Sequence, residues 1–475
     1  MRPWDSMEGN RDPSPPMHAD GLPVPRRYWA IAAIVLAIFM SVLDSTITNI
    51  ALPSIAQSFR VTHAASVWVI NAYQLAILIA LLPLASLGEM VGYRRISQTG
   101  LAVFTLASLA CAFAPSLAAL SVARVIQGLG AAGIMSVNAA LVRFTYPHRM
   151  LGRAIGINAF VVGISAAVGP TVASAVLAVA QWRWLFAINV PVGIVAFAIA
   201  LWALPTTERV SRRLSYVGSA LNAGAFALLV SGLQTFAHER AAALALMQIA
   251  AGCVFAYALV RHELGNPAPL VPLDLLRIRL FRLSVATSVC SFIAQMAALV
   301  ALPFEIQQLG RTPVATGLLM TSWSVAVALT APIAGRLADR HHPGILGGTG
   351  LITLSAGLLL LATMPHPGTA WDFIWRMAVC GVGFGLFQSP NNRAMLASAP
   401  RARSGAAGGM LSTARLLGQT VGAAGVAVLF RGFSQRGSEM ALYIAAGVAL
   451  AAAIVSLSRL TSQAGEPVSP GRREV

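Results

Sequence analysis

The sequence YWAIAAIVLAIFMSVLDSTITNIA, residues 28–51, decides the fold class because it is apolar over the length of a membrane crossing. A transmembrane helix needs about 20 mostly apolar residues. This run is longer than the roughly 7–15 residues of a signal-peptide core, and no small-residue cleavage site follows it. We therefore interpret residues 28–51 as a first transmembrane helix that carries one acid, Asp44.

Thirteen further segments have the same character. Together with the first, the expected spans are 28–51, 65–87, 96–115, 118–143, 154–180, 184–204, 215–236, 242–261, 282–304, 314–337, 345–364, 371–392, 405–430 and 440–459. The chain of 475 residues is 57% hydrophobic and 10% charged, whereas soluble domains carry about 25% charged residues. This composition excludes soluble globular, disordered and disulfide-framework proteins. We predict an all-α polytopic membrane protein with fourteen transmembrane helices.

The arginines predict the orientation of these spans. All 33 basic residues are arginine, and the net charge is +17. With a cytoplasmic N-terminus, the cytoplasmic segments hold 23 arginines and the external loops six. This bias follows the positive-inside rule and predicts a bacterial inner-membrane protein with both termini in the cytoplasm. Because the arginines are spread over every inner loop, no nucleic-acid partner is expected.

The two ends of the chain repeat each other. At an offset of 253 residues the matches are Gly128 with Gly381, Gly130 with Gly383, Asn138 with Asn391, Pro147 with Pro400, Gly152 with Gly405, Gly156 with Gly409, and Gly169 with Gly422. At an offset of 250, residues 51–53 match residues 301–303. We therefore predict a parallel repeat of two six-span bundles, residues 28–204 and 282–460. Two inserted spans occupy 205–281, and cytoplasmic tails occupy 1–27 and 461–475.

No enzyme or metal signature accompanies these spans. The four cysteines, Cys111, Cys253, Cys290 and Cys380, lie inside apolar spans without metal-ligand spacing, and we interpret them as small core residues. The chain carries no Walker motif and no zinc-binding helix motif. We expect no enzymatic activity, no metal and no cofactor. We expect the energy for transport to come from a proton gradient.

Several motifs resemble the major facilitator superfamily, and in particular its fourteen-span drug:proton antiporter family. The first is Leu43-Asp44-Ser45-Thr46-Ile47-Thr48-Asn49-Ile50-Ala51-Leu52-Pro53. The others are Arg124-Val125-Ile126-Gln127-Gly128-Leu129-Gly130, the antiporter motif with Gly163, Gly169 and Pro170, and the stretch from Trp182 to Gly193. The resemblance covers residues 28–460. It implies a major facilitator fold and proton-coupled drug efflux by alternating access.

Two motifs depart from the family pattern. The loop after the second span has Met90 and Tyr93 where the family usually has arginines, and its second-half copy, Gly335 to Arg340, is the better match. The antiporter motif ends in Ala173 and Ser174 instead of two glycines, which questions how closely that helix crosses its neighbour.

Ionisable groups inside a membrane span are costly and usually mark a transport pathway. Asp44 is the one acid well inside a predicted span, with Asn49 just over a turn beyond it. We predict that Asp44 carries the coupling proton, meets a cationic substrate, or does both in alternation; the alternative is a helix-packing contact. For Arg124, with Gln127 one turn later, the resemblance implies a role in proton coupling. A structural ion pair is the alternative.

Other polar residues are candidates to line a cavity. They are Glu305, Gln388, Asn391, Asn392 and Arg415. Solvation at the span end is the alternative for Glu305, and helix capping the alternative for the three amides. Arg415 has no partner nearby in the sequence, so we expect it to find one on another helix. Arg376 has Asp372 four residues earlier, and we expect these two to pair.

Charged residues on two matching cytoplasmic loops are candidates for gating. They are Glu89, Gly92, Arg94 and Arg95 in the first half and Gly335, Asp339 and Arg340 in the second. Such charges can hold the inner side closed by pairing with the other half or with a helix end. Orientation through the positive-inside rule is the alternative.

These features predict a proton-coupled exporter of small amphipathic or cationic toxic compounds. The alternatives are an exporter of one native metabolite, a membrane-bound sensor and a passive channel. The expected partners are a small-molecule substrate, protons and the lipid bilayer. We expect a monomer, and accessory periplasmic proteins stay open as further partners.

Overall fold

The computed structural model describes residues 21–147, 150–207, 215–238, 242–264, 273–338, 340–364, 368–399, 404–433 and 436–459. The helices of the first half are α1 (Arg26–Phe59), α2 (His63–Ser66), α3 (Trp68–Val91), α4 (Tyr93–Ala112), α5 (Leu117–Thr145), α6 (Leu151–Val179), α7 (Arg183–Ala187) and α8 (Asn189–Ala203). Those of the second half are α11 (Arg279–Gln308), α12 (Pro313–Leu337), α13 (Pro343–Ala362), α14 (Ala370–Ser398), α15 (Ser404–Gly432) and α16 (Gly437–Leu457). Between the halves lie α9 (Tyr216–His238), α10 (Ala242–Leu264) and a short 3-10 turn at Leu273–Arg277.

Every predicted span coincides with a helix, which confirms the all-α polytopic fold class. In the described ranges, thirteen helices are long and apolar enough to cross a membrane. The remaining predicted span, 96–115, is α4, which is 20 residues long and carries Arg94 and Arg95 in its first turn. The protein is therefore a multi-pass membrane protein.

The observed helices differ from the predicted spans at their ends. Helix α1 continues to Phe59 and includes Pro53, and α11 continues to Gln308 and includes Pro303. The prediction placed these ends at 51 and 304 because the apolar runs fade there. The helices continue since the backbone hydrogen bonds, and not the apolar length alone, determine where a helix ends.

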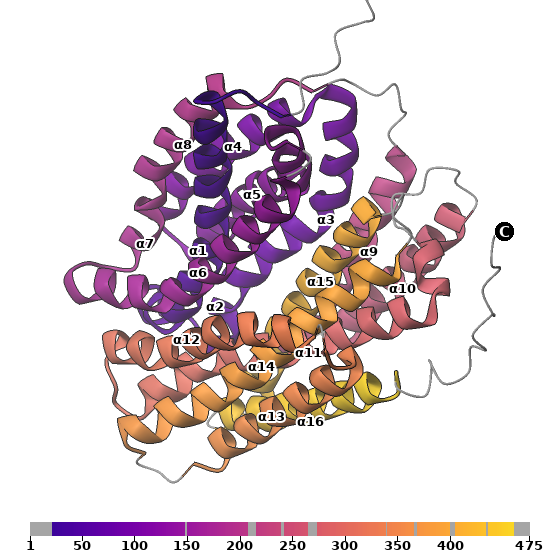
Figure 1. The fold of residues 1–475 in the computed structure, drawn as a ribbon. Helices are drawn as coiled ribbons and strands as arrows, with labels where there is room; N and C mark the ends of the chain where they lie inside the picture. The colour runs from indigo at the N-terminus through magenta and orange to yellow at the C-terminus, as the bar shows by residue number, and fades with distance from the viewer. Residues whose placement is uncertain are drawn as a thin grey trace, which may run out of the picture.

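The six-span halves form two bundles, drawn in indigo to magenta and in orange to yellow in Figure 1. The same pairs of helices pack in each bundle: α1 with α6 and α8, α3 with α5, and α4 with α5 and α8 in the first half. Their counterparts in the second half are α11 with α15 and α16, α12 with α14, and α13 with α14 and α16. This correspondence confirms the predicted parallel repeat.

Close helix contacts reproduce the repeat at the level of single residues. A Cβ added to Gly128 would lie 2.5 Å from the Tyr73 carbonyl oxygen, and one added to Gly381 would lie 2.3 Å from the Trp323 carbonyl oxygen. Glycine is needed at both positions because the backbones approach too closely for a side chain. The paired residues are separated by 253 and 250 positions, as in the sequence alignment of the two halves.

The hydrophobic core is continuous between the halves at one end of the molecule. We call the two ends the Arg26 side and the Phe59 side, after the ends of α1. On the Phe59 side one buried cluster, the shared core, combines residues of both halves such as Leu52, Val67 and Phe304. On the Arg26 side one cluster is built mainly from the first half, with Leu416 of α15 added, and a smaller one lies mainly in the second half. In this conformation the halves are therefore joined mainly on the Phe59 side.

Specific contacts between the halves agree with this division. The His63 ring lies 4.5 Å from the Phe304 ring, and the hydroxyl oxygens of Thr171 and Thr321 are 3.0 Å apart. The inserted helices α9 and α10 pack against each other, and α9 also contacts α3 and α15 (Figure 1). Helix α9 therefore covers one seam between the halves.

Candidate functional site

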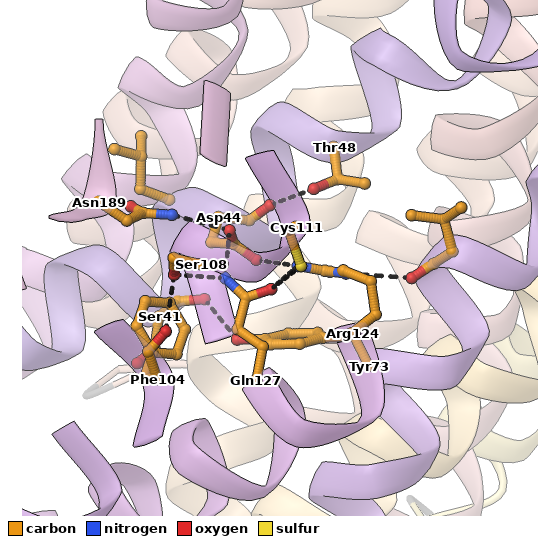
Figure 2. Close-up of polar contacts among 12 residues, drawn as sticks. Ser41, Asp44, Thr48, Tyr73, Phe104, Ser108, Cys111, Arg124, Gln127 and Asn189 are labelled. Atoms are coloured by element: carbon orange, nitrogen blue, oxygen red, sulfur yellow. Dashed lines mark hydrogen bonds and ion pairs between the residues drawn. The ribbon is translucent and has the colours of Figure 1, made fainter. Parts of the chain in front are cut away.

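Asp44, halfway along α1, is fully buried and lies at the centre of a polar cluster (Figure 2). Its Oδ1 accepts hydrogen bonds from the Gln127 amide at 3.0 Å and the Asn189 amide at 2.9 Å. Its Oδ2 forms an ion pair with the guanidinium of Arg124, whose Nη1 donates to it. Three donors from α5 and α8 therefore satisfy the carboxylate.

Arg124 is also fully buried and is held on several sides. Its Nη1 also donates to the Gln127 Oε1 at 2.6 Å, and its Nε donates to the Val69 carbonyl of α3 at 3.1 Å. The guanidinium carbon lies 4.0 Å from the centroid of the Tyr73 ring, which is a cation–π arrangement. These contacts fix the guanidinium against Asp44.

Gln127 extends the cluster to α4. Its Nε2 donates to the Ser108 hydroxyl at 2.9 Å, and its Oε1 lies 3.6 Å from the Cys111 sulfur (Figure 2). Tyr73 donates its hydroxyl to the Ser41 carbonyl of α1 at 3.1 Å. All these partners belong to the first half, so the cluster is internal to one bundle.

The cluster lies where the shared core ends. Along α1, Leu43 and Ile47 belong to the shared core, whereas Met40 belongs to the separate core of the first half. Along α8, Ala196 belongs to that separate core, while Phe186 of the preceding α7 belongs to the shared core. The buried ion pair therefore sits at the boundary between the joined and the separate parts of the two halves.

A buried ion pair is sensitive to loss of either charge. The two charges compensate each other only while Asp44 is ionised, and an unpaired buried guanidinium carries a large desolvation penalty. Protonation of Asp44 would therefore destabilise this arrangement of α1 against α5. Any change in the charge of Asp44 would therefore act on the packing of α1 against α5.

No contact with this cluster is seen among the described residues for Asn49, which was predicted as a coupling residue, or for the predicted cavity residues of α11 and α14. Asn49 is buried five residues beyond Asp44, and its Oδ1 has no hydrogen-bond partner among the described residues. On α14, Asn391 donates to the Ser284 carbonyl at 3.3 Å, while Gln388 and Asn392 are half-buried. Glu305 is half-buried near the Phe59 end of α11.

Arg376 and Arg415, two arginines within spans of the second half, behave differently from each other. Arg376 pairs with Asp372 at 2.8 Å, as predicted. Among the described residues Arg415 makes neither an ion pair nor a hydrogen bond, so a direct partner on another helix stays a prediction. Arg415 lies instead within electrostatic range of Tyr73 of α3.

The predicted antiporter motif lies at two helix crossings. A Cβ added to Gly169 would lie 2.1 Å from the Thr46 hydroxyl of α1, so this glycine permits the contact of α6 with α1. A Cβ added to Gly317 of α12 would lie 2.7 Å from the Pro170 carbonyl and 2.0 Å from the Ser174 hydroxyl. The small residue at this crossing is thus on α12. A Cβ added to Gly163 would have no neighbouring atom within 4 Å, so no close crossing requires glycine at this position.

Two of the predicted gating residues of the first half, Gly92 and Arg94, contact their own bundle. Gly92 has a φ of 101°, which favours glycine, and Arg94 donates to the Leu201 carbonyl of α8. Glu89 is half-buried and Arg95 exposed. In the second half, Gly335 lies against Ser389 of α14 and Arg340 is exposed, whereas Asp339 lies outside the described residues. The gating role stays a prediction.

Three residues of the cluster were not predicted as site residues. Asn189 belongs to a motif that supports the family resemblance, and an amide inside an apolar span is itself a signal of function. Ser108 and Tyr73 carry no such signal because hydroxyl groups are common in transmembrane helices. Their convergence on Gln127 and Arg124 depends on contacts between α3, α4 and α5.

Two repeated helical bundles that share a core on one side, with a buried ion pair at the boundary, define the architecture of a membrane transporter. The family model of the Major Facilitator Superfamily matches residues 34–423 and, in an overlapping second match, 284–474. The chain belongs to this superfamily and is a transporter, not an enzyme.

Relatives with known descriptions agree with this assignment. An Escherichia coli K12 protein described as an uncharacterized transporter, YebQ, is 51% identical over 94% of this chain and 98% of its own length. The multidrug resistance protein Stp of Mycobacterium tuberculosis is 32% identical over 86% of this chain and 75% of its own. The riboflavin transporter RibZ of Clostridioides difficile is 30% identical over 84% of this chain and 87% of its own length.

Solved structures share the fold at low sequence identity. A crystal structure of a POT family transporter in complex with a thioalcohol-conjugated peptide has a TM-score of 0.72 at 12% identity, over 92% of this chain and 96% of that one. A bacterial homologue of the human lysosomal transporter Spinster, in an inward-facing and unoccupied conformation, has a TM-score of 0.69 at 13% identity, over 95% and 100%.

Proposed function

We propose that this transporter exports small amphipathic compounds in exchange for protons by alternating access, in a bacterial inner membrane with both termini in the cytoplasm. The observation that carries the proposal is the Asp44–Arg124 ion pair, fully buried where the shared core ends. Relatives named as a multidrug resistance protein and, in Mycolicibacterium smegmatis, a multidrug efflux pump support export.

The mechanism follows from the charge balance of the ion pair. In the ionised state, the Asp44 carboxylate compensates the positive charge of Arg124 and accepts hydrogen bonds from the side-chain amides of Gln127 and Asn189. When the carboxylate takes up a proton, it becomes neutral and Arg124 loses its counter-charge. The packing of α1 against α5 and α8 then weakens, which favours the alternative arrangement of the two halves.

Substrate and proton do not need to bind at the same time. Exchange requires only that the substrate and the protonated form of Asp44 favour different arrangements of the halves. Asp44 has three donors and no exposure in the present arrangement. Direct competition of a cationic substrate for Asp44 therefore stays a prediction that requires α1 to move.

The test is transport in proteoliposomes with an imposed pH gradient. Two dyes with the same xanthene ring, the cation rhodamine 6G and the anion fluorescein, serve as probes. We expect gradient-driven dye movement that a protonophore abolishes. Asp44→Asn should lower the gradient-driven rate at least about 100-fold, since a neutral amide cannot carry the proton, while it retains downhill dye movement.

Asp372→Asn is the matched control, because Asp372 is an acid outside the cluster that pairs with Arg376 and with the start of its own helix. A wild-type rate in Asp44→Asn would overturn the assignment. Dye movement that persists equally without a gradient would instead identify a passive channel. Movement of neither dye, with proton exchange driven by one metabolite alone, would identify a single-substrate exporter.

A further inference from the structure

Arg415 is a cation placed at the seam between the two halves. It lies in the first half of α15, and the next two residues, Leu416 and Leu417, pack into the separate core of the first half. Helix α15 contacts α3, α9 and α11. Arg415 therefore stands between the bundles, at a level intermediate between the small cluster of the Arg26 side, which contains Met410, and the shared core, which contains Ala423.

The electrostatic surroundings of Arg415 include a buried residue of α3. Its charge interacts with Tyr73, whose hydroxyl bonds the Ser41 carbonyl of α1 and whose ring lies beneath Arg124. Tyr73 is fully buried, and α9 contacts both α3 and α15. Arg415 therefore lies at the α3–α15 seam within electrostatic range of a buried residue of the first half.

The described residues offer Arg415 no counter-charge. Asp44 is already compensated by Arg124, and Glu305 lies near the far end of α11. With Asp44 and Arg124 neutralising each other, the interior near Tyr73 has a net positive charge. Arg415 itself is half-buried at this seam.

Helix α3 also carries buried polar groups that lack hydrogen-bond partners among the described residues. Asn71 and Gln74, one turn apart, are buried; both amide atoms of Asn71 and the Gln74 Oε1 have no hydrogen-bond partner among the described residues. The Gln74 Nε2 reaches only the Met296 sulfur of α11 at 4.0 Å, so this face of α3 is turned towards the second half. Buried amides without partners are costly unless a ligand satisfies them.

We propose that Arg415 binds an anionic group of the transported compound, so that the substrates are amphipathic acids carrying a carboxylate or phenolate. This proposal deepens the proposed export function and rests on it. Guanidinium suits this role because it is weakly hydrated and offers a planar pair of donors to a carboxylate. The buried amides of α3 supply further hydrogen bonds for polar groups of the same compound.

The test is dye binding to the purified full-length protein in detergent, without any gradient, at mildly alkaline pH. Fluorescein, a dianion there, and rhodamine 6G, a cation, share one ring system, and fluorescence polarisation measures their affinities. We expect the wild type to prefer fluorescein. Arg415→Gln should weaken fluorescein binding about 10- to 100-fold, as expected for loss of a charged hydrogen bond, and leave rhodamine 6G binding equal or tighter.

Arg415→Lys keeps the positive charge but loses the planar pair of donors. Its affinity for fluorescein should therefore lie between those of the wild type and Arg415→Gln. Arg431→Gln is the matched control, because Arg431 lies on the same helix at its Phe59 end and donates to the Phe236 carbonyl of α9. An unchanged elution profile in size-exclusion chromatography confirms folding of each variant.

Equal affinity of the wild type for the two dyes, or unchanged fluorescein binding in Arg415→Gln, would overturn this proposal. The outcome is separable from that of the proton-coupling test. If Asp44→Asn transports normally while Arg415→Gln loses fluorescein selectivity, the coupling assignment fails and the anion site stands. If Arg415→Gln keeps its selectivity while Asp44→Asn is inactive, the reverse holds.

Discussion

The polar cluster of the first half has an apolar counterpart in the second half. Through the repeat, the polar residues correspond to apolar ones as follows: Asp44 to Ala294, Arg124 to Met377, Gln127 to Cys380, Ser108 to Leu358, and Asn189 to Leu442. All five counterparts are buried in the shared core. The same helix pairs therefore pack in both halves, once around an ion pair and once around hydrocarbon.

The contacts between α4 and α8 show that the backbone correspondence holds close to this site. In the first half, Gly193 lies against Thr105, and in the second half the Ser355 hydroxyl donates to the Ala446 carbonyl at 2.8 Å. The fold thus does not require the ion pair, since the equivalent positions of the second half pack without one. A polar cluster that packing does not need is a strong indication of function.

The largest expected effect comes from copying one residue of the second half into the first. Arg124→Met leaves the Asp44 carboxylate buried without its counter-charge, which should lower the free energy of unfolding by about 3–5 kcal/mol. Thermal unfolding in detergent measures this loss. Gradient-driven transport should also disappear. A variant as stable as the wild type would mean that Asp44 is not ionised in the folded protein.

The double variant Asp44→Ala with Arg124→Met tests whether the first half can pack around apolar residues at these positions, as the second half does. Replacing both members of a buried ion pair by apolar groups is often neutral, so this variant should regain most of the stability lost in Arg124→Met. Transport should stay absent because no proton carrier remains. If the double variant is as unstable as the single one, the two halves do not tolerate apolar packing equally.

Replacing either of two glycines at equivalent positions of the repeat by alanine should destabilise the protein equally. A Cβ added to Gly130 would lie 2.5 Å from the Phe104 backbone nitrogen, and one added to Gly383 would lie 2.4 Å from the Leu354 nitrogen. Either substitution by alanine should therefore cost about 1–3 kcal/mol through overpacking, as measured by thermal unfolding. Gly447→Ala is the control, because nothing lies within 4 Å of its added Cβ. A large difference between Gly130→Ala and Gly383→Ala would show that the halves are packed differently.

Much of this comparison could be predicted from the sequence. The apolar runs predict every span, and the offsets of 253 and 250 residues reproduce the observed contacts of Gly128 with Tyr73 and Gly381 with Trp323. The cost of burying charge was enough to select Asp44 and Arg124 individually. These are properties of single helices or of an ordered pattern along the chain.

The convergence of side chains from different helices could not be predicted. Asn189 reaches Asp44 across 145 positions of sequence, and Gln127 reaches Ser108 across 19. Such contacts depend on the rotation and crossing of helices, which apolar periodicity does not determine when helices are apolar on most sides. For the same reason, the sequence could not indicate which helix lies within electrostatic range of Arg415, which in the structure is α3 through Tyr73.

The smallest expected effect concerns two buried cysteines, one in each environment. Cys111 lies 3.6 Å from the Gln127 Oε1, whereas Cys380 occupies the position equivalent to Gln127 within the shared core. Cys111→Ser should change the free energy of unfolding by less than about 0.5 kcal/mol, because the hydroxyl can donate to Gln127. Cys380→Ser should cost about 1–2 kcal/mol, since its hydroxyl is buried among apolar groups and can at best bond a carbonyl one turn earlier on α14. Parallel thermal unfolding of the two variants measures the difference, and equal losses would show that the polar cluster does not extend its hydrogen bonding to position 111.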